Sequence, residues 1–226
     1  MLELLPMLSL GLGLGLLHAL DADHVMAMSV LSSEKPGLGQ GLFFSGFWAL
    51  GHGSMIILIT AVLFSFGWVV PQQLIGMAET AVGLLLVGLG LKLFFNFKGK
   101  SIQLEQHSHG DIVHSHWHNT KHLHNPAGNL SGAHKPVLIG LLHGFAGSAP
   151  AIALIPALAY AEINMVALYL LTFSIGVMLA MMGFGLGFSY CQGVLMERYQ
   201  VIAKYQAKLV ALTSVSVGCF WLSQAV

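Results

Sequence analysis

Six long apolar runs, separated by short polar segments, determine which class of protein this chain can form. They cover, roughly, residues 4–31, 38–66, 72–96, 136–160, 165–189 and 201–225. Each run is long enough to cross a bilayer, which takes about 20 apolar residues. In these runs apolar and polar residues do not alternate, which favours helices over the strands of a membrane barrel. With 8% charged residues and a mean hydropathy of +0.78, the chain is predicted to be an all-α, polytopic membrane protein with six transmembrane helices.

Two halves joined by one polar insert make up the predicted organisation: residues 1–96, the insert 97–135, and residues 136–226. A shift of 125 residues places the segment Gly-Leu-Leu-His at 15–18 over the same four residues at 140–143, and Gly51 over Gly176. With three spans in each half, the second half would enter the membrane from the opposite side. We therefore expect a 3+3 inverted repeat, a design that places the substrate site near the bilayer centre between the repeats.

The nine Lys and Arg residues fall in or beside segments on one side of the predicted membrane. By the positive-inside rule that side is cytoplasmic, so both termini are expected outside. The N-terminal region has neither the basic cluster nor the small-residue cleavage site that a signal peptide carries, so no cleaved signal peptide is expected. The expected location is the inner, cytoplasmic membrane, crossed several times. Cys191 and Cys219 form no recognisable disulfide framework or thiolate metal site.

Four polar groups interrupt the first apolar run, in the segment LLHALDADHVM at residues 16–26: His18, Asp21, Asp23 and His24. An aspartate at a helix centre costs about 2.5–3.5 kcal/mol on insertion scales, so some partner is required. That partner can be a proton, a basic residue, buried water or a metal cation, and the run contains no Lys or Arg. On a regular helix Asp23 points away from the other three, so it either orients an imidazole or the helix unwinds here.

Two further histidines lie in other apolar runs, His52 between glycines at 51 and 53, and His143 before Gly144. The predicted metal site therefore draws on His18, Asp21, Asp23, His24, His52 and His143. Imidazole and carboxylate ligands without thiolate disfavour Cu(I) but do not separate Ni(II), Co(II) and Zn(II). Glu79, in the third run, could relay a cation or could equally be a carboxyl bound by its own helix.

Two of these segments resemble signatures of the nickel/cobalt transporter (NiCoT) superfamily. His18-Ala19-Leu20-Asp21-Ala22-Asp23-His24 is similar to its His-x4-Asp-His motif, and the segment FWALGHGS at 47–54 is similar to its second signature. The resemblance implies that His18, Asp23 and His24 are indispensable for metal uptake. The later acidic signature of eight-span members is missing. The segment HGFAGSA at 143–149 instead resembles the shorter, six-span UreH-type permeases associated with urease maturation, which leaves metal preference and direction open.

A histidine-rich segment, HSHGDIVHSHWHNTKHLH at 107–124, lies in the polar insert. Its polar composition predicts a disordered cytoplasmic loop. Because His-x-His spacing lets two imidazoles reach one ion, the loop is expected to be an auxiliary metal reservoir; the alternative is a solvated linker. The auxiliary residues are His107, His109, His114, His116, His118, His122 and His124.

The leading functional hypothesis is a secondary transporter of Ni(II), and of Co(II) as second substrate, that is not an enzyme and needs no cofactor. No nucleotide-binding motif is present to couple ATP hydrolysis. Its expected partners are the metal ion, the lipid bilayer and cytoplasmic nickel chaperones or urease-maturation proteins, with no nucleic acid. An exporter of the same superfamily, a haem-binding membrane redox protein and a metal-dependent intramembrane hydrolase remain alternatives.

Overall fold

Helices make up almost all of the described chain. The computed structural model describes residues 4–34, 37–66, 71–99, 104–109, 112–117, 134–146 and 163–224. In chain order the elements are α1 (Leu4–His18), α2 (Ala22–Glu34), α3 (Leu38–Phe66), α4 (Gln72–Gly99), β1 (Leu104–His109), β2 (Ile112–Trp117), α5 (His134–Phe145), α7 (Ile163–Arg198) and α8 (Gln200–Gln224). Their apolar composition agrees with the prediction of a helical membrane protein.

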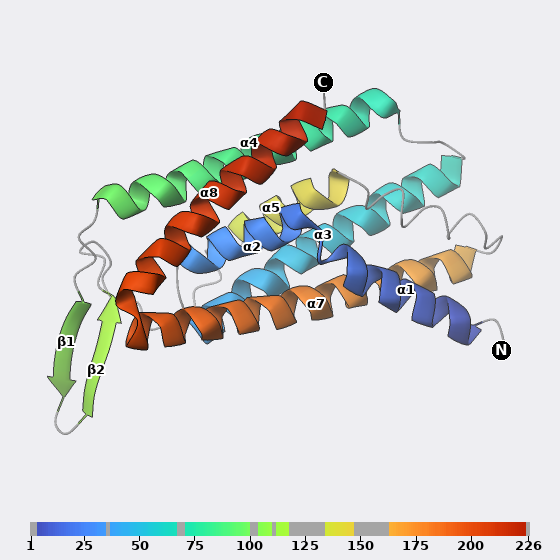
Figure 1. Cartoon of the computed structure of the whole chain (residues 1–226). Coiled ribbons are helices and arrows are strands. Elements are labelled where there is room, and N and C mark those ends of the chain that lie inside the picture. Colours follow the sequence, from blue (N-terminus) through green and yellow to red (C-terminus); the bar gives the residue numbers. More distant parts are fainter. Residues whose placement is uncertain are drawn as a thin grey trace.

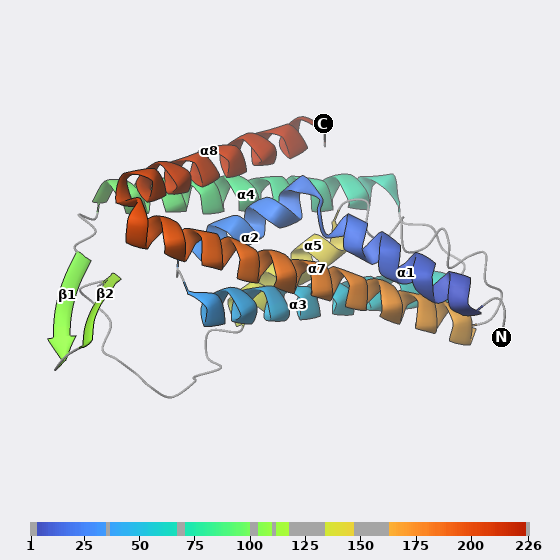
Figure 2. The same ribbon diagram turned by 60° about the horizontal axis from the view of Figure 1, so that its bottom comes forward.

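The helices form a bundle with a filled centre. α4 and α8 lie side by side along one edge, and α1, α3 and α7 lie along the other, with α2 and α5 between them (Figures 1 and 2). α2, α4 and α7 all end at the same end of the bundle, where β1 and β2 also lie (Figure 1). The N-terminus lies at the opposite end (Figure 1). We call the end that carries the two strands the hairpin end.

Three single helices in the described ranges are long and apolar enough to cross a membrane: α3, α7 and the Gln73–Asn96 part of α4. α1 and α2 together make a fourth candidate span, bent by 61°. α8 is not among them, since polar residues such as Gln206 and Lys208 reduce its apolar character. Part of the predicted fourth run, residues 147–160, lies outside the described residues. Six spans therefore remain a prediction.

Glycines set the closest helix contacts. A Cβ atom on Gly15 of α1 would overlap the carbonyl oxygen of Phe173 on α7, and one on Gly140 of α5 would overlap that of Trp48 on α3. No side chain fits there, so these backbones touch directly. Lipid gives no hydrophobic drive for helices to associate, and close approach at small residues supplies the packing energy instead.

The contacts of α1 with α7 recur between α5 and α3 at positions 125 residues apart. The Gly15–Phe173 contact corresponds to the Gly140–Trp48 contact, and the approach of Gly176 to Leu12 corresponds to that of Gly51 to Val137. α4 and α8 also approach each other closely at glycines. Gly83 faces the carbonyl oxygen of Gly218, and Gly90 faces that of Ala211.

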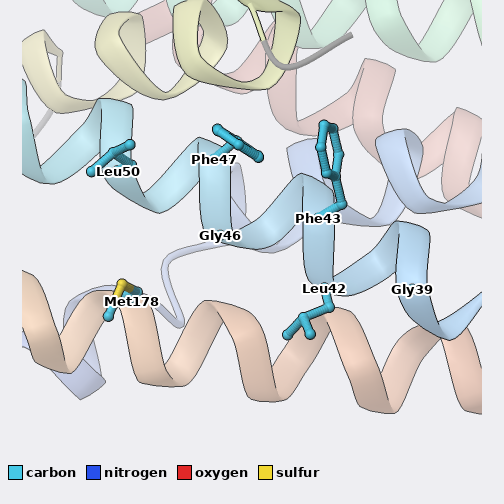
Figure 3. A pocket seen from close by; sticks show the side chains of 7 residues that line it. All are labelled: Gly39, Leu42, Phe43, Gly46, Phe47, Leu50 and Met178. Carbon is cyan, nitrogen blue, oxygen red and sulfur yellow. The ribbon is translucent and has the colours of Figure 1, made fainter. Parts of the chain in front are cut away.

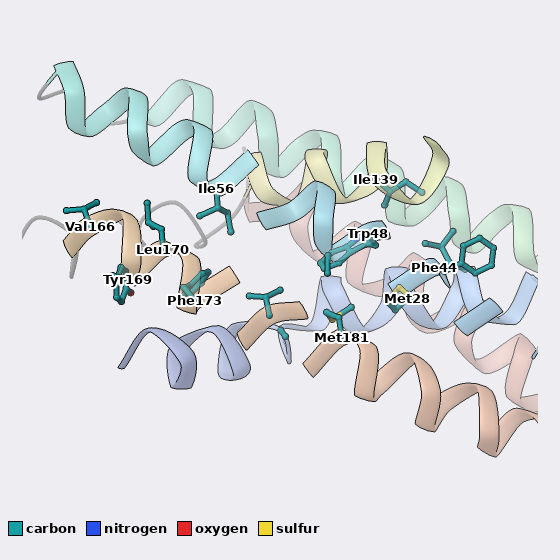
Figure 4. Packing of buried hydrophobic residues seen from close by; sticks show 14 of the residues in the cluster. Met28, Phe44, Trp48, Ile56, Ile139, Val166, Tyr169, Leu170, Phe173 and Met181 are labelled. Carbon is teal, nitrogen blue, oxygen red and sulfur yellow. The ribbon is translucent and has the colours of Figure 1, made fainter. Parts of the chain in front are cut away.

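Two buried apolar clusters hold the bundle together. The larger one joins α1, α2, α3, α5 and α7 around Trp48, Tyr169 and Phe173, all 0% exposed (Figure 4). The second joins α2 to α4 and α8 through residues such as Ala27, Val30 and Leu86. α2 contributes to both clusters, so its position is fixed from two sides.

The insert differs from the prediction in one respect. A disordered loop is expected over 97–135, whereas β1 and β2 pair as an antiparallel hairpin with His107 opposite His114 and Glu105 opposite His116. The strand-favouring residues Ile112, Val113 and Trp117 explain this pairing. The hairpin is the exception to the all-α class. Residues 100–103, 110–111 and 118–133, including His118, His122 and His124, lie outside the described residues.

Candidate metal centre

The break between α1 and α2 brings the first motif together. α1 ends at His18, with backbone bonds from Leu20 N to Leu17 O and from Asp21 N to His18 O, a tighter turn than an α-helix. Asp21 then precedes α2 as its N-cap residue, a position that favours aspartate. On one continuous helix His18 and His24 would point about 120° apart. The 61° bend instead lets their rings meet, with centroids 4.6 Å apart.

Three buried histidines converge at this point: His18, His24 and His52. Each offers a ring nitrogen, and these three atoms all lie within 4.8 Å of one another. The ring of His52, from the middle of α3, lies 5.4 Å from that of His18 and 4.8 Å from that of His24. One metal ion can reach ligand atoms so grouped after small side-chain adjustments, because metal–imidazole bonds are about 2.0–2.1 Å long.

His143 brings a fourth imidazole from the second half of the chain. It is 0% exposed, and its ring lies 5.6 Å from that of His24. Its Nδ1 donates a hydrogen bond of 2.9 Å to the carbonyl oxygen of Ile139, which leaves Nε2 without a partner. The close approach of α5 to α3 at Gly140 makes this position available.

The two aspartates of the motif contact the histidines at Nδ1. His24 Nδ1 donates a hydrogen bond of 2.9 Å to Asp23 Oδ1. His18 Nδ1 lies 2.9 Å from Asp21 Oδ2, an ion-pair distance without hydrogen-bond geometry. Asp23 is buried, whereas the side chain of Asp21 is 44% exposed. Carboxylates that hold Nδ1 in this way fix the tautomer and ring orientation of metal-binding histidines.

The cluster is short of hydrogen-bond partners. Nε2 of His18, His24 and His143, and both ring nitrogens of His52, are buried without one. Each such group costs about 1–3 kcal/mol when nothing compensates it. A divalent cation accepts lone pairs from several imidazoles at once, so these atoms together fit a cation better than they fit packing alone.

Sequence reasoning missed two aromatic residues that surround the cluster. Trp48 stacks on His52, with centroids 4.9 Å apart and planes at 10°, and also contacts His24 and His143. Phe173 stacks on His18 at 5.7 Å. The spacing of one helical turn between Trp48 and His52 was a signal for the first contact. Phe173 lies far away in sequence and gave none.

Other candidate positions lie apart from this cluster. Glu79 on α4 is partly buried and does not belong to the metal-compatible group found among the described residues. A groove beside α3 and α7 is lined by Gly39, Leu42, Phe43, Gly46, Phe47, Leu50 and Met178 (Figure 3). It contains no imidazole or carboxylate, so it is unsuited to a metal ion.

Comparison with known proteins places a curated relative beside this chain. Over 186 residues the chain is 30% identical to the urease accessory protein UreH of Bacillus sp. (strain TB-90), a match that covers 80% of this chain and 75% of the relative. No protein-family model matches the chain. No solved structure matches it either.

Proposed function

The chain belongs to the UreH-type branch of the nickel/cobalt transporters, and from this premise we propose that it carries Ni(II), and Co(II) as a second substrate, across the cytoplasmic membrane through the histidine cluster. It is of the accessory and transport type and is not an enzyme. One observation carries the proposal: six buried ring nitrogens from four histidines lack a hydrogen-bond partner in an apolar bundle.

We assign the Nε2 atoms of His18 and His24 and a ring nitrogen of His52 as ligands, with His143 as a fourth. Asp21 and Asp23 act by orienting imidazoles and by supplying two negative charges that offset the ion's two positive ones. Buried charge is tolerated in a membrane when it is paired. The exposed thiols Cys191 and Cys219 take no part, and an all-imidazole set suits Ni(II), Co(II) and Zn(II).

The proposed transport cycle uses an inverted repeat of three spans plus three, with six spans in all. The recurrence of the α1–α7 contacts in α5–α3 supports this arrangement, and so does the position of His18 and His143 at equivalent places in the two halves. Movement of one repeat against the other would expose the central site first to one side and then to the other.

Transport by purified protein in vesicles of known orientation tests the proposal. An inside-negative potential contributes about 4.6 kcal/mol per 100 mV for a divalent ion, so radioactive nickel should accumulate inside and cobalt should compete with it. Net movement only outward from the cytoplasmic side would establish the exporter alternative. Absence of nickel movement in both orientations, with the protein correctly inserted, would refute the proposal.

The histidine-rich insert has a secondary role in this proposal, as a cytoplasmic reservoir that passes metal to nickel chaperones or urease-maturation proteins. Deletion of residues 107–124 should lower the efficiency of uptake at low nickel concentrations by several-fold and leave the maximal rate nearly unchanged. The measurement is uptake against nickel concentration in cells, with an equally long polar linker as control. A complete loss of transport would show that the insert belongs to the transport path itself.

A further inference from the structure

A second set of buried polar residues lies on α2 and α7, toward the hairpin end. Ser32 of α2 is 0% exposed, and Ser189 and Gln192 of α7 are each 2% exposed. Both hydroxyl oxygens and the side-chain oxygen of Gln192 lack a hydrogen-bond partner. None of them was a candidate from the sequence, because serine and glutamine are common in helices.

Buried serine hydroxyl groups in these helices are of two kinds, those with a local partner and those without one, and the second kind comprises Ser32, Ser33, Ser174 and Ser189. Ser29 donates to the carbonyl oxygen of Val25, and Ser45 donates to that of Gly41, each one turn earlier in its own helix. This local bond is the ordinary way for a buried serine to be satisfied in a helix. Ser32 and Ser189 do not make it, so their hydroxyl groups are free to bind something else.

Helix geometry places Ser32 further along α2 than the histidine cluster, in the direction of the hairpin end (Figure 1). His24, Met28 and Ser32 follow one another at steps of one turn on α2, so Ser32 lies about 12 Å along the helix from His24. Met28 packs in the same cluster as Phe44 of α3 and Met181 of α7, which puts this side of α2 against those helices (Figure 4).

Ser189 is two turns beyond Met181 on α7, again toward the hairpin end. A Cβ atom on Gly41 of α3 would overlap the Ser189 hydroxyl oxygen, which shows that Ser189 points to α3. Gln192 follows three residues later and shares that side of the helix. The layer of Met28, Phe44 and Met181 therefore separates the histidine cluster from the three oxygens.

We propose that Ser32, Ser189 and Gln192 form a second station for the divalent cation, between the histidine cluster and the cytoplasm, where the ion is held together with part of its water shell. This inference rests on the proposed function. Neutral oxygens hold a hydrated divalent ion more weakly than imidazoles do. A weak station next to a strong one lets an ion leave the strong site without becoming trapped.

Cysteine accessibility tests whether water reaches this group. In a background with Cys191→Ser and Cys219→Ser, the variants Ser32→Cys and Ser189→Cys are exposed to a membrane-impermeant cationic thiosulfonate from the cytoplasmic face of inside-out vesicles. Both cysteines should react, and nickel should slow the reaction. The matched control is Ser214→Cys, which replaces a buried serine whose hydroxyl donates to the carbonyl oxygen of Leu86; it should not react.

Reactivity of both variants no higher than that of Ser214→Cys would overturn the inference. A second measurement does not depend on cysteine variants. The double variant Ser32→Ala, Ser189→Ala should bind nickel at the histidine cluster as the wild type does, but transport it about tenfold more slowly, because a weak polar contact to a charged species is lost. Unchanged turnover would also contradict the station. The labelling experiment measures access of the reagent to the cysteines and does not require nickel transport. The proposed second station and the proposed transport function can therefore fail separately.

Discussion

Replacement of His24 by alanine should abolish nickel uptake while the protein is still inserted in the membrane. His24 contacts His18, His52 and His143 at ring distances of 4.6 to 5.6 Å and is the common neighbour of the cluster. Its loss removes a proposed ligand and opens a cavity between the other histidines. Because loss of an outer orienting group already costs about 10–100-fold in metal affinity, loss of a ligand should exceed that. Uptake of radioactive nickel by cells that express equal amounts of protein measures the effect.

Two related variants make this result specific. Asp23→Asn keeps the size of the side chain but removes the charge that faces His24 Nδ1, so nickel affinity should fall by about 10–100-fold. His134→Ala, at the exposed start of α5, removes a histidine away from the cluster and should leave uptake unchanged. If His24→Ala transported nickel at the wild-type rate, the assignment of the central site would be wrong.

Replacement of Gly140 by alanine should reduce the amount of folded protein severely. The added methyl group would overlap the Trp48 carbonyl oxygen and would lie 3.0 Å from the His52 backbone nitrogen. Neither neighbour is a flexible side chain, so α5 must move away from α3. Overpacking of this kind typically costs about 1–3 kcal/mol, and the shift would also displace His143 from His24. Thermal unfolding in detergent, followed by size-exclusion chromatography, measures the loss.

Matched glycines provide the comparison. Gly15→Ala, in which the methyl group would overlap the carbonyl oxygen of Phe173, should destabilise the protein to a similar extent. Gly13→Ala is the control, since no atom lies within 4 Å of a Cβ built there. Equal stability of the Gly140 and Gly13 variants would mean that the α3–α5 contact is looser than described. Different losses at Gly15 and Gly140 would argue against an inverted repeat.

The candidate residues of the site follow from the cost of polar groups inside a membrane. His18, Asp23, His24, His52 and His143 were singled out on that basis, and the structure buries all five together with partnerless nitrogens on the histidines. The aspartates were harder to place. Sequence reasoning gave Asp21 and Asp23 as ligands or orienting groups, and only the side-chain geometry puts both carboxylates at Nδ1 atoms.

The sequence by itself determined the helical membrane class and the residues of the His/Asp motif, since apolar length and the cost of buried charge are properties of the chain alone. The tertiary structure decided that α1 bends into α2, that Trp48 and Phe173 surround the histidines, and that Ser32 and Ser189 lie without partners. Those features depend on which helices pack together. That choice is made by backbone contacts at glycines distant in sequence, and no local pattern of residues specifies it.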